Sequence, residues 1–236
     1  MSDALKVLRL HLLKREMVIA VPVFILALVI IISVLISIAA SRFGVDVTSA
    51  KWQEGFANNG GAVWSIPGFL VYMGVQAVST TFPFGMALGT TRSAYSRGTA
   101  LYFLLQSILI GLLGLLLLVV ERWTNGWFMH ARVFDVLLLG NGNPWKVFAT
   151  LTAIAFFSLT VGSVFGALFI KAGAKGPLVL AIAVVLVLAV LLVVFAPQLG
   201  EIIRNITRAD ILLTLVGIGL AAVAGQYAAL RVASVR

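Results

Sequence analysis

The 236-residue sequence contains no cysteine and very little charge. The absence of cysteine excludes disulfide bonds, thiol redox relays and cysteine metal sites. Charged residues make up only 11% of the chain and hydrophobic residues 61%, whereas an ordinary soluble domain has about 25% and about 45–50%. A chain this apolar cannot hide its side chains in one water-soluble core. The composition therefore predicts an integral membrane protein.

Apolar segments long enough to cross a membrane recur along the chain, since a helical span needs about 20 apolar residues. None of these segments contains Asp, Glu, Lys or Arg. The rest of the chain is divided among two ends and the connecting loops, so no independent soluble domain fits. We predict six transmembrane helices at Met17–Ala40, Gly68–Leu88, Thr99–Val120, Val147–Ile170, Pro177–Phe195 and Ile211–Leu230.

The predicted fold class is an all-α membrane protein with a single transmembrane domain over residues 1–236, its six spans lying within residues 17–230. Residues 1–16 precede the first span and carry Leu5, Leu8 and Leu12 on one side of a helix, with basic residues between them. Such a helix lies along a membrane surface. We therefore predict an N-terminal interfacial helix on the cytoplasmic side.

The distribution of lysine and arginine gives the orientation, because basic residues favour cytoplasmic loops. With the N-terminus inside, the inner pieces hold Lys6, Arg9, Lys14, Arg15, Arg92, Arg97, Lys171, Lys175, Arg231 and Arg236. The outer pieces hold Arg42, Lys51, Arg122, Arg132, Lys146, Arg204 and Arg208. Both termini are therefore predicted to be cytoplasmic. The expected location is the cytoplasmic (inner) membrane of a bacterium.

Tryptophan supports this orientation independently. Amphipathic indole rings favour the headgroup layer, and the predicted outer loops hold or adjoin Trp52, Trp64, Trp123, Trp127 and Trp145. The net charge of +9 then reflects topology and attraction to anionic membrane lipid. Nucleic acid is not expected as a partner.

The predicted spans lack the groups that most membrane chemistry needs. Ion-coupled carriers use intramembrane carboxylates, His or Lys, whereas the embedded polar residues here are neutral, such as Gln76, Gln106 and Gln226. His11 and His130 have no metal-ligand spacing. The phosphate-binding pattern GxxxxGK[ST] is also absent. We expect no catalytic residue, metal site or cofactor in this chain, and no enzymatic activity.

The segment Phe82–Tyr102 has the sequence FPFGMALGTTRSAYSRGTALY. It resembles the bend between the second and third spans of permease subunits in type-2 ABC transporters. In that family, a proline-containing end of the second span leads to a Gly-Thr-Arg-rich loop, an aromatic residue and a further glycine. The plan is similar too: a surface helix, six spans, both ends inside, and a short outer helix before the last span, here expected at Gly200–Arg208.

The resemblance implies a cytoplasmic coupling loop at residues 89–98, which docks on a separate ATPase subunit holding ATP and Mg²⁺. The two flanking glycines enclose about two helical turns, a threonine can cap the first turn, and arginine and tyrosine are typical of protein–protein contacts. The predicted coupling residues are Gly89, Thr90, Thr91, Arg92, Tyr95 and Arg97. The alternative is that the arginines only mark the cytoplasmic side and Tyr95 is an interface anchor.

The second predicted span is the candidate for lining a substrate cavity. Pro67 and Pro83 bracket it, and a proline permits a bend by freeing a backbone carbonyl. The polar side chains available to the cavity are Gln76, Ser79 and Thr80. The alternative is that these groups bond to neighbouring helices.

Small residues recur every fourth position in two spans. They are Ser158, Gly162 and Gly166 in the fourth span and Gly217, Ala221 and Gly225 in the sixth. This spacing lets helix backbones approach closely in lipid. We predict helix packing at both sets, within the subunit or across a dimer.

Together these features predict the membrane-spanning subunit of an ATP-driven ABC exporter, a homodimer or a heterodimer with a related permease. The uncharged spans favour an amphipathic or apolar cargo, such as a drug-like molecule, a lipid or a peptide. One alternative is the substrate-capture subunit of an ATPase-driven vitamin uptake system, for which the outer loops show no pattern of a polar pocket. Another is a non-transporting membrane partner or immunity protein.

Overall fold

The computed structural model describes residues 3–233, and every regular element in that range is helical. The predicted inner residue Arg236 lies outside the described residues. Five helical segments are long and apolar enough to cross a membrane: Glu16–Arg42, Arg92–Trp123, Pro144–Ala172, Lys175–Asn205 and Arg208–Arg231. The chain is therefore an all-helical, multi-pass membrane protein. Each of these segments contains one predicted span.

The second predicted span, Gly68–Leu88, is divided between two helices. α4 (Gly61–Ser79) begins earlier than predicted and runs through Pro67, and α5 (Thr81–Ala87) follows a break at Thr80. A membrane helix can pass through proline because neighbouring groups satisfy the carbonyl that loses its partner. A sixth span formed by α4 and α5 stays a prediction.

The remaining elements follow the apolar pattern closely. The N-terminal helix α1 (Asp3–Leu12) ends before the predicted residue 16, and a single π-helical turn (Glu16–Ala20) then leads into α2 (Val21–Arg42). The short helix expected before the last span is α9 (Leu199–Asn205). The other helices are α3 (Ala50–Ala57), α6 (Arg92–Trp123), α7 (Pro144–Ala172), α8 (Lys175–Phe195) and α10 (Arg208–Arg231).

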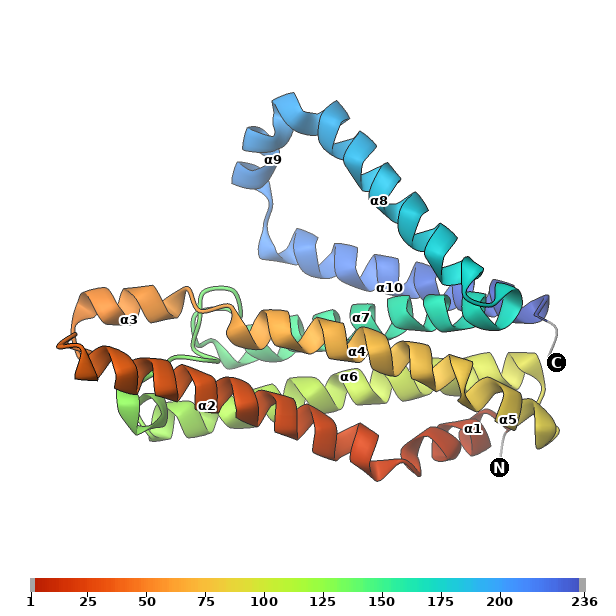
Figure 1. Ribbon diagram of the computed structural model, residues 1–236, viewed down its shortest axis with the longest axis horizontal. Helices are drawn as coiled ribbons and strands as arrows, with labels where there is room; N and C mark the ends of the chain where they lie inside the picture. The colour runs from red at the N-terminus through yellow and green to blue at the C-terminus, as the bar shows by residue number, and fades with distance from the viewer. Residues whose placement is uncertain (1–2, 234–236) are drawn as a thin grey trace. The chain divides into compact units, whose positions relative to one another are not determined.

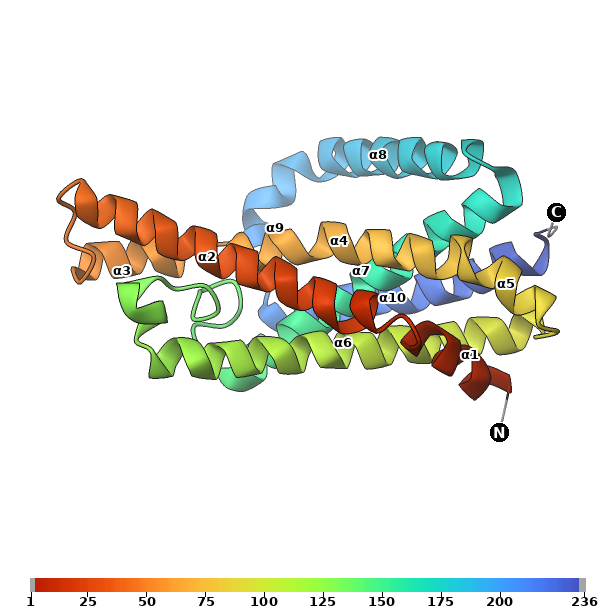
Figure 2. The same ribbon diagram turned by 60° about the horizontal axis from the view of Figure 1, so that its bottom comes forward.

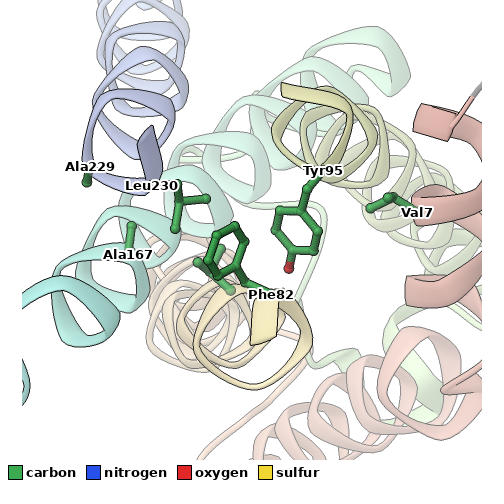
Figure 3. Packing of buried hydrophobic residues seen from close by; sticks show 7 residues of the cluster. Val7, Phe82, Tyr95, Ala167, Ala229 and Leu230 are labelled. Carbon is green, nitrogen blue, oxygen red and sulfur yellow. The ribbon is translucent and has the colours of Figure 1, made fainter. Parts of the chain in front are cut away.

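The described chain divides into two compact units. The first comprises residues 3–11, 71–101 and 159–233. Its core is a cluster of buried side chains from α1, α4, α5, α6, α7 and α10: Val7, Val78, Phe82, Tyr95, Ala167, Ala229 and Leu230. Figure 3 shows the Phe82 ring between Leu230 and Tyr95, with Val7 on the other side of Tyr95.

Within this first unit, α8 differs from every other long helix. None of its residues is buried against the described chain. Figures 1 and 2 show α8 leading away from the end of α7, with α9 turning the chain back into α10. A helix that is apolar all round and uncovered in this way suits a lipid environment.

The second unit comprises residues 12–70 and 102–158. In this unit α6 and α7 pack so closely that two glycines of α6 leave no room for a side chain. A Cβ on Gly111 would lie 2.1 Å from Thr152 Oγ1, and one on Gly114 would lie 2.0 Å from Leu151 Cδ1. At the π-helical turn, the Gln106 side-chain amide donates to the Val18 carbonyl at 2.8 Å. Four residues after Val18 stands Pro22, which has no N–H to donate to this carbonyl, so the polar side chain satisfies it instead.

Candidate functional site

The turn between α5 and α6 contains the predicted coupling residues. Gly89 has φ +79°, a conformation that suits glycine. The Thr90 hydroxyl donates back to the Gly85 carbonyl. The Thr91 hydroxyl accepts from the Ala94 backbone N–H at 3.2 Å, so Thr91 is the helix cap. Residues 92–98 form the first turns of α6 rather than a separate short helix.

Tyr95 is expected at the surface, as a contact for a partner or as an interface anchor, but its side chain is fully buried. Its hydroxyl donates to the Ala77 carbonyl of α4 at 2.6 Å. The Phe82 ring lies edge-on to it, with ring centroids 5.1 Å apart (Figure 3). The His11 ring centroid lies 6.0 Å from that of Tyr95. In this conformation Tyr95 has no surface to offer a partner subunit. It instead connects α6 to α4, α5 and α1.

Arg92 also turns toward the rest of the chain. Its guanidinium donates to the carbonyls of Leu230, at 3.2 Å, and of Arg231, at the end of α10. These are orphan carbonyls at the C-terminus of a helix, where a positive charge is favourable. Arg92 therefore caps α10, a role that its sequence position does not reveal.

The first turns of α6 lie directly against α1. A Cβ on Gly98 would lie 2.5 Å from the Ala4 carbonyl oxygen and 2.6 Å from the Val7 Cβ, so only glycine fits without a shift. Next to it, the His11 ring nitrogen Nε2 lies 3.0 Å from the Thr99 hydroxyl. The α5–α6 turn is thus held to α1, α4 and α10 at once.

Part of the α5–α6 turn remains open to the surroundings. Leu88 is 64% exposed, and Gly89, Thr91 and Arg97 are exposed as well. The Arg97 Nε donates only within its own helix, to the Ser93 carbonyl at 3.3 Å. These four residues, hereafter the exposed turn, form a surface available to another molecule.

The candidate cavity residues lie on α4 and at its end. The Gln76 side-chain amide donates to the Tyr72 hydroxyl at 3.0 Å, and the Thr80 hydroxyl donates to the Gln76 carbonyl at 2.7 Å. Ser79 is half-buried and Thr80 is exposed. The two hydrogen bonds stay within one helical stretch and do not tie these groups to a neighbouring helix. Cavity lining stays a prediction.

The small residues of α7 lie where two backbones come close. A Cβ on Gly162 would lie 2.1 Å from the Val71 carbonyl oxygen, and one on Gly166 would lie 2.6 Å from that of Val75. From the other helix, a Cβ on Gly74 would lie 2.1 Å from the Leu159 carbonyl oxygen. One turn before this crossing, Ser158 is buried and its hydroxyl donates to the Ile154 carbonyl. This is the close approach of α4 and α7 that the four-residue spacing favours.

The corresponding residues of α10 are largely uncovered. Gly217 and Ala221 are exposed, and a Cβ on Gly217 would meet no atom within 4 Å. Gly225 has one neighbour, the Val164 Cγ2, at 3.9 Å from its ideal Cβ. Among residues 3–233, no close helix crossing like that of α4 and α7 is formed at Gly217 or Gly225. Contact across a dimer stays a prediction.

The sequence analysis missed a polar site in the loop between α6 and α7. Glu121 is 2% exposed. Its carboxylate accepts four hydrogen bonds: from the Trp127 indole N–H and from the backbone N–H groups of Val133, Phe134 and Asp135, all at 2.9–3.0 Å. Glu121 follows the last apolar residue of a predicted span, so its position suggests an exposed flank. Only the folded loop provides its donors.

A pocket of about 140 Å³ opens beside this carboxylate. Two parts of the chain form it, since Gln53 comes from α3 and the other lining residues come from the end of α6 and the loop that follows it. This convergence explains why no sequence pattern predicts a polar pocket in these loops. Its lining residues are Gln53, Glu121, Arg122, Asn125, Gly126, His130, Arg132 and Asp135.

Comparison of the chain with protein-family models, with curated proteins and with solved structures gives no match. The geometry of the α5–α6 turn and of the α6–α7 loop is therefore the ground on which a function is argued.

Proposed function

We propose that this chain is the membrane-spanning permease subunit of an ATP-driven ABC exporter. Its topology would comprise six spans with both ends on the cytoplasmic side of a bacterial inner membrane. The observation that carries the proposal is the α5–α6 turn, which combines an exposed surface with bonds to α1, α4 and α10. A turn that only marked the cytoplasmic side would not need these connections.

The mechanism follows from these connections. A separate ATPase subunit, holding ATP and Mg²⁺, would dock on the exposed turn and displace it as the ATPases close. Because Tyr95 and Arg92 join the turn to α4 and α10, the displacement would reach those helices as a rigid-body motion. Packed interfaces transmit small shifts of this kind because they switch between discrete arrangements. Two permease chains, identical or related, would open a cavity between them alternately inward and outward.

The cargo class follows from the spans. Charged groups in a transmembrane pathway mark ion or charged-substrate routes, and the predicted spans carry none. An amphipathic or apolar cargo, such as a drug-like molecule, lipid or peptide, suits a pathway lined by Gln76, Ser79 and Thr80. The chain itself would neither bind nor hydrolyse ATP, because it lacks the phosphate-loop pattern.

Purification of the tagged chain from its native membranes in mild detergent tests this proposal. The expected complex contains a subunit with the GxxxxGK[ST] pattern and hydrolyses ATP. The Arg97→Glu variant should lose at least about tenfold in affinity for that subunit, as expected at a contact hot spot. Lys171→Glu, a change at an exposed lysine of the predicted inner side, is the matched control and should keep it. A complex without an ATP-hydrolysing subunit contradicts the proposal and favours a non-transporting membrane partner.

A second candidate function is the substrate-capture subunit of an ATPase-driven vitamin uptake system. The polar pocket beside Glu121 favours it, because a capture subunit needs such a pocket on the outer side. The two functions differ in what the isolated chain does. A capture subunit binds a water-soluble vitamin tightly without its ATPase, whereas an exporter permease does not, and equilibrium dialysis of the purified chain against a vitamin mixture separates them.

A further inference from the structure

Two arginines line the pocket beside Glu121, and several of its acceptor side chains already have partners within the protein. The Glu121 carboxylate is already occupied by four N–H groups. The Gln53 side-chain carbonyl accepts from the Arg132 Nε at 2.9 Å, and the Asp135 carboxylate lies 3.6 Å from the Arg122 Nε. The Glu121 and Gln53 acceptors are thus engaged by donors of the protein itself, and Asp135 is paired with an arginine.

The unused donors belong to the two arginines. A guanidinium carries five N–H donors, and each of these engages a protein group through Nε. The terminal nitrogens of Arg122 and Arg132 are therefore the donors to consider for a ligand. The His130 Nε2 lies 3.3 Å from the Asn125 amide nitrogen. When that ring nitrogen accepts, Nδ1 carries a proton and adds a donor.

We infer that this pocket binds a phosphate group. A phosphate presents several acceptor oxygens and negative charge, and guanidinium forks are well matched to it. A divalent cation suits the pocket poorly, because the Glu121 carboxylate already accepts four N–H groups and two arginines line the same pocket. The volume of about 140 Å³ is comparable to a cavity that holds one benzene molecule, which admits a phosphate group but not a nucleotide.

The backbone around the pocket is held in an unusual conformation. Asn125, Trp127, Phe128 and His130 all have positive φ between 50° and 64°. Residues other than glycine rarely adopt this region, and such conformations cluster at binding sites where the surrounding structure enforces them. Here the Trp127 indole is held by Glu121, and the backbone N–H groups of Phe128 and Ala131 donate to the carbonyls of Thr124 and Gly126. The loop is therefore pre-organised before any ligand arrives.

The phosphate has two potential sources, a free anion or the headgroup of a membrane lipid. The side chains of Trp123 and Phe128, close to the lining residues in sequence, are 87% and 79% exposed. Exposed aromatic side chains at the end of a membrane span insert at the headgroup layer. A lipid phosphate at that level would reach the arginines with its acyl chains still in the bilayer. The inference does not rest on the proposed function.

Two binding measurements on the purified full chain test the inference. In the first, inorganic phosphate is titrated onto the chain in a non-ionic detergent and the heat of binding is recorded. In the second, the chain is taken from vesicles of phosphatidylglycerol mixed with an uncharged glycolipid, and native mass spectrometry counts the lipids it retains. Heat in the first arm identifies a free-phosphate site, and retained phosphatidylglycerol alone identifies a headgroup site.

Variants decide whether the arginines are responsible. Arg132→Gln and Arg122→Gln should each weaken binding about tenfold or more, since each removes charge-assisted donors. Arg42→Gln, at an exposed arginine of the same unit outside the pocket, should bind as wild type. The Arg122 side chain is 49% exposed, so that variant should fold normally, which gel filtration checks. Absence of binding in both arms, or equal binding by all three variants, overturns the inference while leaving ATPase co-purification untouched.

Discussion

The loops at the two ends of α6 are held in contrasting ways. The α5–α6 turn is fixed by apolar packing around Tyr95 and by the capping of α10 by Arg92. The α6–α7 loop instead depends on a single buried carboxylate, that of Glu121, for four of its hydrogen bonds. The first loop distributes its stabilisation over several helices, so that it can move with them. The second concentrates its stabilisation in one group, so that its shape is rigid but easily lost.

Removal of the Tyr95 ring should have the largest effect. Tyr95→Ala leaves a cavity in a fully buried cluster, and such substitutions cost about 3–5 kcal/mol. The temperature at which half the protein stays monodisperse on gel filtration in detergent should fall sharply. Tyr72→Ala is the control, because that side chain is 49% exposed. Similar losses for both variants would show that Tyr95 does not hold the α5–α6 turn.

Neutralisation of Glu121 should cause the second-largest loss of stability. Glu121→Gln keeps the shape of the side chain but replaces an acceptor oxygen with an N–H₂ donor that faces backbone donors. Hydrogen bonds to charged groups contribute about 1.5–3 kcal/mol each and are not additive, so we expect a loss of at least about 2 kcal/mol. Glu54→Gln, at an exposed position, should be neutral in the same assay. Equal stability of the Glu121 and Glu54 variants would show that the α6–α7 loop does not depend on the Glu121 carboxylate.

Loss of the Arg92 cap should have the smallest effect. Arg92→Ala removes two hydrogen bonds to the last carbonyls of α10, and we expect a cost of about 1–2 kcal/mol. Arg97→Ala is the matched control, because its side chain is exposed and donates to the Ser93 carbonyl of its own helix. Hydrogen exchange measured by mass spectrometry should show faster exchange at the end of α10 in the first variant alone. Unchanged exchange there would mean that Arg92 acts only through its charge.

Much of the helical pattern could be predicted from the sequence. Long apolar runs locate five of the membrane helices, and the four-residue spacing of Gly162 and Gly166 locates a helix crossing. The start of α4 was missed, because Pro67 suggests a boundary and the structure accommodates it inside the helix. The cap by Thr91 was predicted as one of two alternatives, since Ser and Thr side chains satisfy a free N–H at a helix start.

The sites were less predictable, because their partners are distant in sequence. Tyr95 looks like a surface anchor next to two arginines, and its burial depends on Phe82, Ala77 and His11 from other helices. Glu121 looks like a charged flank of a span, and its donors lie up to 14 residues away in the loop. The local sequence pattern predicts where a helix lies, but it does not predict which distant residues pack against that helix.

The most direct measurement is photo-crosslinking from the exposed turn. The chain has no cysteine, so Thr91→Cys introduces a single thiol to which a photoreactive maleimide can be attached in native membranes. We predict an adduct to a subunit with the GxxxxGK[ST] pattern, with a yield that changes when a non-hydrolysable ATP analogue is added. Lys51→Cys, on the predicted outer side, should give no such adduct. Labelling of Thr91→Cys by a membrane-impermeant maleimide in intact cells, without an ATPase adduct, would contradict the coupling role of this turn.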